Sequence, residues 1–307
     1  MAIDVTRKHD TFFAQIGGVD LRRPLSGESW REIEAAFNGE AVLLFRDQPL
    51  TDQQQLAFSE RFGPVFSATN YHWKKQQRRV HAKMADISNI GPGGELLAPK
   101  DERRLHALAN RLWHTDNTFK HIPARCSLLL AREVPQQGGD TEFADMRAAY
   151  DALPQAKKTQ IEDLVVEHSV SHSRKSMGID VLTDGARNEL PPVQQVLVRY
   201  NASSSRKALY IASHASHIVG WPQDKGRALL DELTAHATQS RFVYRHQWRA
   251  GDLILWDNRC TMHRATEYDD LHARRDMQRS TVSDEINSVE RRAMERGKVS
   301  ATCGVGT

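Results

Sequence analysis

Residues 111 to 119 read RLWHTDNTF, and within this stretch His114 and Asp116 stand two positions apart. Residues i and i+2 of a β-strand point to the same side, so these two side chains can occupy neighbouring positions around one metal ion. The pair alone is weak evidence, because 14 histidines and 39 acidic residues in 307 positions bring such pairs together by chance. A surface or capping pair is the alternative, and a metal site needs a third ligand from elsewhere in the chain.

Three other histidines are candidates for that third ligand. His263 ends the apolar stretch WDNRCTMHRA, where an imidazole that points inward needs a polar partner. A core histidine bonded to a backbone carbonyl is the alternative for His263, and His214 and His217 in the stretch SHASH compete with it. Two histidines and one carboxylate on one face of a metal ion leave three positions open, which is the arrangement of non-haem Fe(II) oxygenases.

Two arginines follow in the stretch ARRDMQR. Arg275 and Arg279 lie four positions apart, so on a strand they share a face, with Met277 between them. Two guanidinium groups that point inward each need an anion, and arginine suits bidentate recognition of carboxylates. A dicarboxylate cosubstrate and an acidic substrate would supply these anions. A solvated edge strand, blunted by its charges, is the alternative.

Composition limits the classes of protein to be considered. With 42 Lys and Arg against 39 Asp and Glu, the net charge of +3 argues against nucleic-acid binding driven by phosphate contacts. No apolar run approaches the length of about 18 residues that a membrane span requires, and the first residues contain no apolar signal-peptide core. Three cysteines are too few for a disulfide framework. We therefore expect a cytoplasmic protein without nucleic-acid or membrane partners.

Hydrophobic patterning predicts many short strands with a few helices between them. Such a succession favours an antiparallel sandwich or barrel over a parallel sheet, and no Pro/Gly/Ser-rich linker divides the chain. A helix capped by Thr51 and another that starts near Asp145 interrupt the strands. The expected strands lie within 41–48, 81–99, 126–134, 138–145, 208–222 (with both histidines of SHASH in the turn after the strand), 242–265 and 274–285; a further helix spans 226–239, and a surface helix with a loose tail follows 284.

The motifs resemble those of a known family. The stretches LWHTDNTF, GGDTEFADMRAAYDALP and WDNRCTMHRA followed by ARRDMQR are similar to the Fe(II)/2-oxoglutarate-dependent dioxygenases of the taurine dioxygenase superfamily. Within that superfamily, the chain most resembles the bacterial 2,4-dichlorophenoxyacetate dioxygenases, to which AVLLFRDQPLTDQQQLAFSERFGP, MADISN and SHASHIVG are also similar. The similarity spans about residues 12 to 285, which is nearly the whole chain apart from its tail.

The resemblance implies a fold and a ligand set. It implies a double-stranded β-helix, or jelly roll, with helices packed outside, in one domain over residues 1–285 followed by a charged tail over 286–307. By matching position, His114, Asp116 and His263 would bind Fe(II). Thr141, Arg275 and Asn110 would contact 2-oxoglutarate. The usual family spacing from the last histidine would select Arg274, but the sharing of a strand face with Arg279 favours Arg275.

The resemblance also implies a reaction. Oxidative decarboxylation of 2-oxoglutarate with O2 would yield succinate and CO2 and hydroxylate an acidic small molecule, such as a phenoxyacetate, which would then split into a phenol and a keto acid. Arg279 is the first candidate for the substrate carboxylate, His214 and His217 are further candidates, and Lys74, Lys75 and Lys100 lie in loops that could close over the site.

Three alternatives stay open. The same chemistry could act on a sulfonate or another carboxylate. The same three ligands could hold Zn(II) in a hydrolase, which would leave Thr141 and the two arginines unexplained. A jelly-roll binding protein without catalytic activity is the third alternative. A homo-oligomer is expected.

Overall fold

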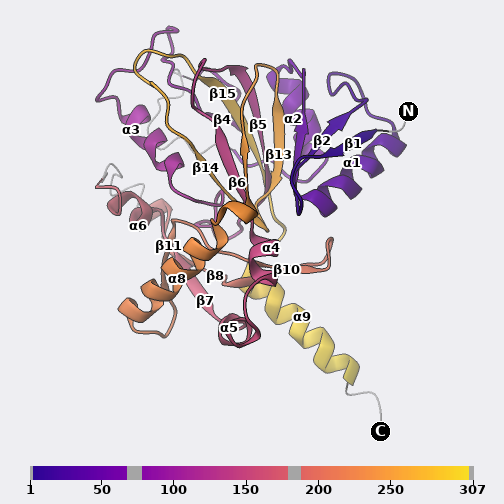
Figure 1. The fold of residues 1–307 in the computed structure, drawn as a ribbon, viewed down its shortest axis with the longest axis vertical. Helices are drawn as coiled ribbons and strands as arrows, with labels where there is room; N and C mark the ends of the chain where they lie inside the picture. The colour runs from indigo at the N-terminus through magenta and orange to yellow at the C-terminus, as the bar shows by residue number, and fades with distance from the viewer. Residues whose placement is uncertain (1–2, 68–77, 179–187, 304–307) are drawn as a thin grey trace.

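The computed structural model of the chain describes residues 3–67, 78–178 and 188–303, with side chains up to residue 297 (Figure 1). Its largest element is a seven-stranded sheet in the order β1-β2-β3-β13-β5-β15-β4. All neighbours in this sheet are antiparallel except β2 and β3. The strands are β1 (Asp4–Arg7), β2 (Ala14–Gly17), β3 (Val42–Phe45), β13 (Leu253–Asp257), β5 (Ala124–Glu133), β15 (Asp276–Ser283) and β4 (Met84–Asp86).

A smaller antiparallel sheet packs against one face of this large sheet. Its order is β12 (Val243–His246), β6 (Thr141–Asp145) and β14 (Thr261–Ala265). A buried apolar cluster lies between the two sheets and joins Phe143 of β6 to Trp256 of β13 and Met277 of β15. The expectation of antiparallel strands rather than a parallel sheet is therefore confirmed. The two layers provide the walls between which a site can form.

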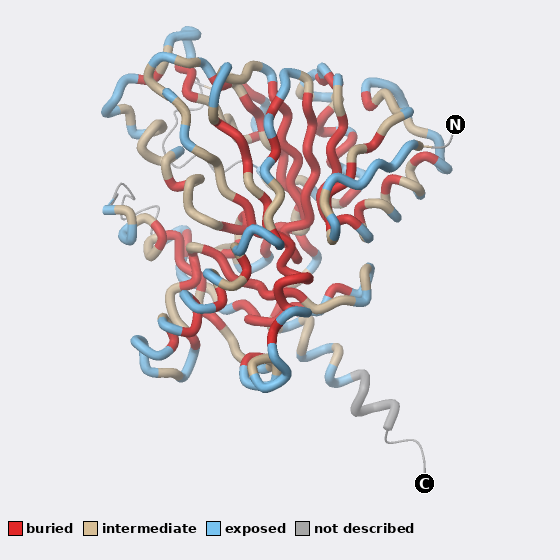
Figure 2. The backbone as a smooth tube through the Cα atoms, viewed as in Figure 1, coloured by how far each residue is buried: buried red, intermediate tan, exposed pale blue. Residues whose placement is uncertain are grey.

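Helices cover the opposite face of the large sheet. In α1 (Gly27–Glu40), Ile33 and Phe37 are buried four positions apart, so both side chains lie on one stripe of the helix and pack on Leu128 and Leu255. Thr51 begins α2 (Asp52–Glu60) with a capping box, as the sequence predicted. The central strands are consequently buried on both faces, whereas β1 at the edge is exposed (Figure 2).

The remaining strands form two further small sheets. They are the sheet β11-β7-β8 and the hairpin of β9 and β10. Helices α4, which begins after the expected cap Asp145, and α8 pack on them through a second apolar cluster. The elements are β7 (Val165–His168), β8 (Val193–Val196), β9 (Val198–Asn201), β10 (Arg206–Leu209), β11 (Ala215–Ile218), α4 (Met146–Asp151), α5 (Gln155–Ile161), α6 (Val170–Lys175) and α8 (Gln223–Ala237); α3 (Glu102–Leu108) lies beside β14 through the short helix η2 (Ala109–Arg111).

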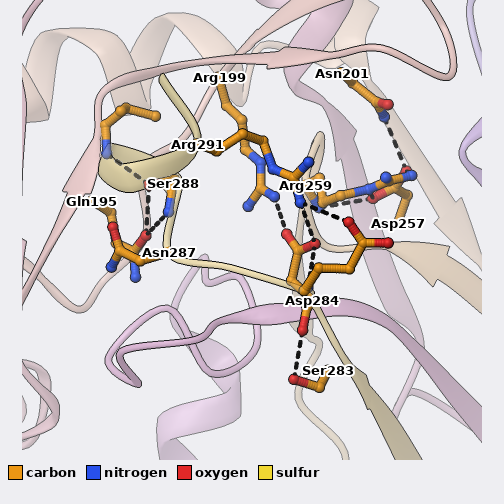
Figure 3. A network of polar contacts seen from close by, with 12 residues as sticks. Gln195, Arg199, Asn201, Asp257, Arg259, Ser283, Asp284, Asn287, Ser288 and Arg291 are labelled. Atoms are coloured by element: carbon orange, nitrogen blue, oxygen red, sulfur yellow. Dashed lines mark hydrogen bonds and ion pairs between the residues drawn. The ribbon is translucent and has the colours of Figure 1, made fainter. Parts of the chain in front are cut away.

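The last helix, α9 (Ser288–Cys303), leaves the body of the molecule and points away from the large sheet (Figure 1). Buried ion pairs hold its start (Figure 3). Asp284 accepts from Arg199 of β9 and from Arg291 of α9, and Arg259 pairs with Asp257 nearby. The charged residues after 284 thus begin as a surface helix that is anchored at one end.

Two details of the expected strands differ from the structure. His217 was expected in a turn after a strand, but it lies within β11, and His214 lies in the turn just before β11. The HTD stretch was treated as a strand, but His114 forms only an isolated bridge with His263, and Asp116 already belongs to a turn. Within the described residues, no helix has the length and apolar character that would be needed to cross a bilayer.

Candidate metal centre and the cavity beside it

Three buried side chains converge between the two sheets. His114, Asp116 and His263 each offer one ligand atom, and these atoms lie within 4.8 Å of one another. Nε2 of His114 is 3.9 Å from Oδ1 of Asp116, and Nε2 of His263 is 3.9 Å from Oδ2 of the same carboxylate. Each residue is at most 6% exposed. This is the only group of its kind that is found among the described residues, and its donor set of two imidazoles and one carboxylate suits Fe(II).

Backbone pairing brings the two histidines together. The N–H of each donates to the carbonyl of the other, at 2.9 and 2.8 Å, so His114 extends the small sheet beyond β14. Their ring centroids are 4.2 Å apart. Directly opposed residues of an antiparallel pair point to the same face, which explains why both imidazoles reach one point although 149 positions separate them in the chain.

The hydrogen-bonding state of the imidazoles suits metal binding. Nδ1 of His114 lies 2.7 Å from the carbonyl of Leu112, which can only accept, so Nδ1 carries the proton and Nε2 keeps a lone pair. Burial lowers the pKa of His114, although the nearby charge of Asp116 opposes this shift. Burial also lowers the pKa of His263 well below its usual value, with a further contribution from His114. Both rings are therefore neutral at neutral pH, as metal ligands must be.

Asp116 stays ionised in this setting. Burial by itself would raise its pKa, but the charge of Arg279 and a hydrogen bond from Ser127 keep the pKa below its usual value. Nη1 of Arg279 lies 2.5 Å from Oδ1, and Oγ of Ser127 lies 2.7 Å from Oδ2. A buried carboxylate that is ionised at neutral pH supplies the negative ligand of the set.

A cavity opens beside His114 and His263, and six of the residues that the sequence singled out line it. Its wall includes His114, His263, Thr141, Arg275 and Arg279. Asn110, Arg104 and Arg111, from α3 and η2, and Tyr268 and Trp256 also line it.

Arg275 brings a cation into this cavity. It is 6% exposed, and its Nε donates to the carbonyl of Gly139 at 3.2 Å. Among the described residues, no carboxylate forms an ion pair with it, and burial lowers its pKa to about 10. Arg274 is exposed and pairs with Glu133 at 3.0 Å instead. Arg275 and Arg279 thus line the same cavity, and Arg274 is not among its lining residues.

A hydrogen bond fixes the hydroxyl of Thr141. The indole N–H of Trp248 lies 3.0 Å from Oγ1 of Thr141. Because an indole nitrogen can only donate, Oγ1 accepts this bond, and its own proton remains available to an acceptor in the cavity. Thr141 and Arg275 therefore both present donors to the same space.

The two remaining histidines are not part of the ligand group. His214 is buried, and its Nδ1 lies 2.9 Å from Oγ of Ser173. His217 contacts Ser216 at 3.0 Å and lies 3.7 Å from Glu167. Neither one lines the cavity beside the metal ligands. Lys100 is exposed, and Lys74 and Lys75 lie outside the described residues.

The sequence did not reveal several polar residues that orient the site. Ser127 donates a hydrogen bond to the carboxylate of Asp116, and Asn258 accepts one from the backbone N–H of Asp116. Trp248 donates a hydrogen bond to the hydroxyl of Thr141. Asn89 accepts from the backbone N–H of Arg275 at 2.8 Å and donates to the carbonyls of Asp270 and Ala273, which fixes the start of β15. The only signal available was polarity within apolar stretches, as in CSLLLA around Ser127.

The chain is similar to known proteins over most of its length. Residues 4–281 match the family model described as taurine catabolism dioxygenase TauD, TfdA family. An alpha-ketoglutarate-dependent 2,4-dichlorophenoxyacetate dioxygenase of Cupriavidus pinatubonensis is 45% identical over 286 residues, which cover 93% of this chain and 99% of that protein. An (S)-phenoxypropionate/alpha-ketoglutarate-dioxygenase of Sphingobium herbicidovorans is 36% identical, over 87% of this chain and 91% of that protein.

A solved structure is similarly close. The crystal structure of AAD-2 in complex with Mn(II) and N-oxalylglycine superposes with a TM-score of 0.86 at 45% identity, over 93% of this chain and 99% of that chain. The match of the family model over most of the chain and the identity with its members over nearly their full lengths lead to one conclusion. The chain belongs to the TauD, TfdA family of dioxygenases.

Proposed function

We propose that this chain is an Fe(II)- and 2-oxoglutarate-dependent dioxygenase that hydroxylates an aryloxyalkanoate, such as a phenoxyacetate. The observation that carries the proposal is a buried arginine, Arg275, which has no carboxylate partner among the described residues and lines the same cavity as His114 and His263. A buried guanidinium requires an anion, and a dicarboxylate that reaches the metal ligands with its other end supplies one.

In this proposal His114, Asp116 and His263 hold Fe(II). The neutral imidazoles and the ionised carboxylate fit this ion, and three ligands leave positions for other molecules. The iron, when bound, couples decarboxylation of 2-oxoglutarate by O2 to hydroxylation of a C–H bond, with succinate and CO2 as products. The chain itself contributes binding and orientation.

Two donors would recognise the far carboxylate of 2-oxoglutarate. Arg275 provides a planar pair of N–H donors, and Thr141 provides the proton that its bond with Trp248 leaves available. Asn110 lines the same cavity and would contact the cosubstrate from η2. The deep position of Arg275 favours an extended dicarboxylate over a small monocarboxylate.

The substrate would enter the same cavity with its own anion. Arg279 lines the cavity and lies beside Asp116, so it is the first candidate for the substrate carboxylate. His214 and His217 are proposed as further contacts of the substrate's ether or carboxylate, although neither lines this cavity. Hydroxylation of the carbon that carries the aryloxy oxygen gives a hemiacetal, which collapses to a phenol and a keto acid.

Both named relatives support an aryloxyalkanoate as the substrate, because each acts on a phenoxy acid according to its name. The alternative is the same chemistry on a sulfonate or another carboxylate. A protein named putative alpha-ketoglutarate-dependent sulfonate dioxygenase from Schizosaccharomyces pombe, 30% identical over 92% of this chain, belongs to the more distant relatives and keeps this alternative in the test.

We also propose that the large sheet and β12-β6-β14 are the two faces of a double-stranded β-helix. The antiparallel packing of the two sheets around Phe143, Trp256 and Met277 supports this assignment. One domain over residues 1–285 would carry the site, and residues 286–307 would form an appended charged segment. The homo-oligomer and the cytoplasmic location stay predictions from the sequence.

Succinate release in the presence of Fe(II), 2-oxoglutarate and O2 tests the proposal, with a panel of phenoxyacetates, phenoxypropionates, alkyl sulfonates and aliphatic carboxylates. We expect a phenoxy acid to give the highest rate and to yield a phenol in equal amount with succinate. Hydrolysis of any panel member without oxygen or 2-oxoglutarate would favour the Zn hydrolase. A protein that binds the ligands without turnover of any compound would favour the inactive binding protein.

A further inference from the structure

A series of hydrogen bonds through three buried side chains leads to the carboxylate of Asp116. Ser127 and Asn258 are fully buried, and Trp256 is 1% exposed. Oγ of Ser127 lies 2.7 Å from Oδ2 of Asp116, and Nδ2 of Asn258 lies 2.9 Å from Oγ of Ser127. Nε1 of Trp256 lies 3.0 Å from Oδ1 of Asn258. Strand register produces this closeness, because Trp256 of β13 is paired with Ser127 of β5.

The chain of hydrogen bonds can run in one direction only. The indole of Trp256 has a donor and no acceptor, so the atom of Asn258 that faces it is the carbonyl oxygen. The amide nitrogen of Asn258 therefore faces Ser127 and donates to its oxygen. Ser127 has a single proton, and an ionised carboxylate can only accept, so this proton goes to Asp116. Each bond polarises the next along such a chain.

Asn258 also holds the backbone of Asp116. Its Oδ1 lies 3.2 Å from the backbone nitrogen of Asp116 and accepts that N–H. One amide thus fixes the turn that carries Asp116 and, through Ser127, the orientation of its carboxylate. This matters because Asp116 lies in a turn, and no regular strand pairing holds its backbone there.

We propose that Asn258 and Ser127 are positioning residues that preset the carboxylate of Asp116 for the metal ion. The inference rests on the proposed metal site and adds the cause of its geometry. Without the proton from Ser127, the carboxylate can rotate about its last bond, and one of its oxygens loses a buried partner. Groups that orient a metal-binding carboxylate in this way contribute about ten- to a hundredfold to metal affinity.

Anaerobic titration of the metal-free protein with Fe(II), and separately with Co(II), measures this contribution directly. We expect Ser127→Ala to weaken the binding of both metals about ten- to a hundredfold. The matched control is Ser59→Ala, which removes an equally buried hydroxyl from α2, where it bonds Gln55 and Ser280 away from the metal ligands. The control should lower the melting temperature as much as Ser127→Ala does and leave both affinities unchanged.

A second variant acts from the other end of the chain of hydrogen bonds. Asn258→Ala removes the partner of the Asp116 backbone as well as that of Ser127, so we expect a loss of metal affinity at least as large as in Ser127→Ala. Equal affinity of the wild type and both variants would overturn the inference, and so would the loss of the folded state in both. A wild-type protein that binds neither metal would instead refute the metal site itself.

Discussion

Arg275 illustrates how one residue limits the ligands of a cavity. Its guanidinium is nearly free of water, and the surroundings that the structure describes offer only the carbonyl of Gly139 to its Nε. The unfavourable burial is visible in its pKa, which burial lowers to about 10. A carboxylate at this place restores the lost solvation, and the natural bidentate partner of an arginine is such a group.

We therefore predict that Arg275→Ala raises the apparent Michaelis constant for 2-oxoglutarate far more than that for the substrate. Loss of one buried carboxylate–guanidinium contact costs about 2–5 kcal/mol, which corresponds to about a thirtyfold effect or more. Arg274→Ala is the matched control, because Arg274 is exposed and bonds Glu133. Steady-state kinetics with each compound varied in turn measures both constants. A large defect in Arg274→Ala with a nearly normal Arg275→Ala would reject the assignment.

The metal ligands give a second prediction. His114→Ala, Asp116→Ala and His263→Ala should each abolish turnover while the protein stays folded, because each removes one ligand from a set of three. His214→Ala and His217→Ala should leave Fe(II) binding largely intact, since their nearest polar partners are Ser173 and Ser216. Metal titration and circular dichroism of the five variants provide the measurements. If one of these three variants keeps most of its activity, the substituted residue is not a metal ligand.

Trp248 gives a prediction that separates orientation from packing. In Trp248→Phe the aromatic ring stays against His246, from which the indole is 4.8 Å distant, but the N–H that fixes Thr141 is lost. Thr141 can then turn its proton elsewhere. One neutral hydrogen bond contributes about 0.5–1.5 kcal/mol, so the affinity for 2-oxoglutarate should fall about two- to tenfold while the rate at saturation is retained. Unchanged binding in an anaerobic 2-oxoglutarate titration would argue that Trp248 only packs.

At the scale of elements, the turn before β6 places its backbone against Arg275. Gly139 has φ +69°, and a Cβ added there would lie 3.4 Å from Cδ of Arg275 and 3.0 Å from Pro135. The turn at Gly139 thus touches the side chain of Arg275, and the carbonyl of Gly139 accepts the N–H of Nε. This contact joins the turn before β6 to the residue that precedes β15.

Gly139→Ala should therefore lower stability and raise the Michaelis constant for 2-oxoglutarate together. The left-handed backbone costs a non-glycine residue about 1 kcal/mol or more. The added methyl group would also crowd Cγ of Pro135 at 3.0 Å, which shifts the turn whose carbonyl accepts from Arg275. Gly220→Ala isolates the first effect, because Gly220 has φ +80° and no atom within 4 Å of an added Cβ. Thermal unfolding measures the stability of the two variants, and steady-state kinetics measures their Michaelis constants for 2-oxoglutarate. An equal kinetic defect in both would show that Arg275 does not depend on this contact.

The sequence predicted the features that depend on residues close together in the chain, and it did not predict those that depend on distant residues. Strand periodicity placed Arg275 and Arg279 on one face, and the cap at Thr51 located α2, because both rest on neighbours within a few positions. The same periodicity failed for Asp116, which reaches the metal ligands from a turn. The hydrogen bonds among Ser127, Asn258 and Asp116 depend on the register of β13 on β5. Because Ser127 and Asn258 are 131 positions apart, the sequence does not reveal this register.

At the scale of the whole molecule, buried histidines make the fold sensitive to acid. His168 of β7 is fully buried, neither ring nitrogen has a hydrogen-bond partner in the described structure, and burial lowers its pKa to about 3. An unfolded histidine has a pKa of about 6.5. Between these two values the unfolded chain binds a proton that the folded chain does not, so stability is lost as the pH falls from about 6.5 towards 3.

We predict that His168 alone removes about 2 kcal/mol of the free energy of unfolding between pH 7 and pH 5. His168→Phe should abolish that part of the pH dependence, since phenylalanine fills a similar space beside Tyr210 and does not titrate. Denaturant unfolding of both proteins, without metal, at the two pH values gives the comparison. An identical loss of stability in the wild type and the variant would exclude His168 as a source.

The outward course of α9 has a practical consequence. Ion pairs around Asp284 hold the start of this helix, and Arg296, about halfway along it, pairs with Asp163. The helix extends away from the sheet that carries the candidate metal centre (Figures 1 and 3). A resin, an electrode linker or a fused reporter attached beyond residue 303 would thus sit at the end of a stalk that the protein already possesses. Immobilised preparations joined through this end should keep the cavity beside His114 and His263 facing the bulk liquid.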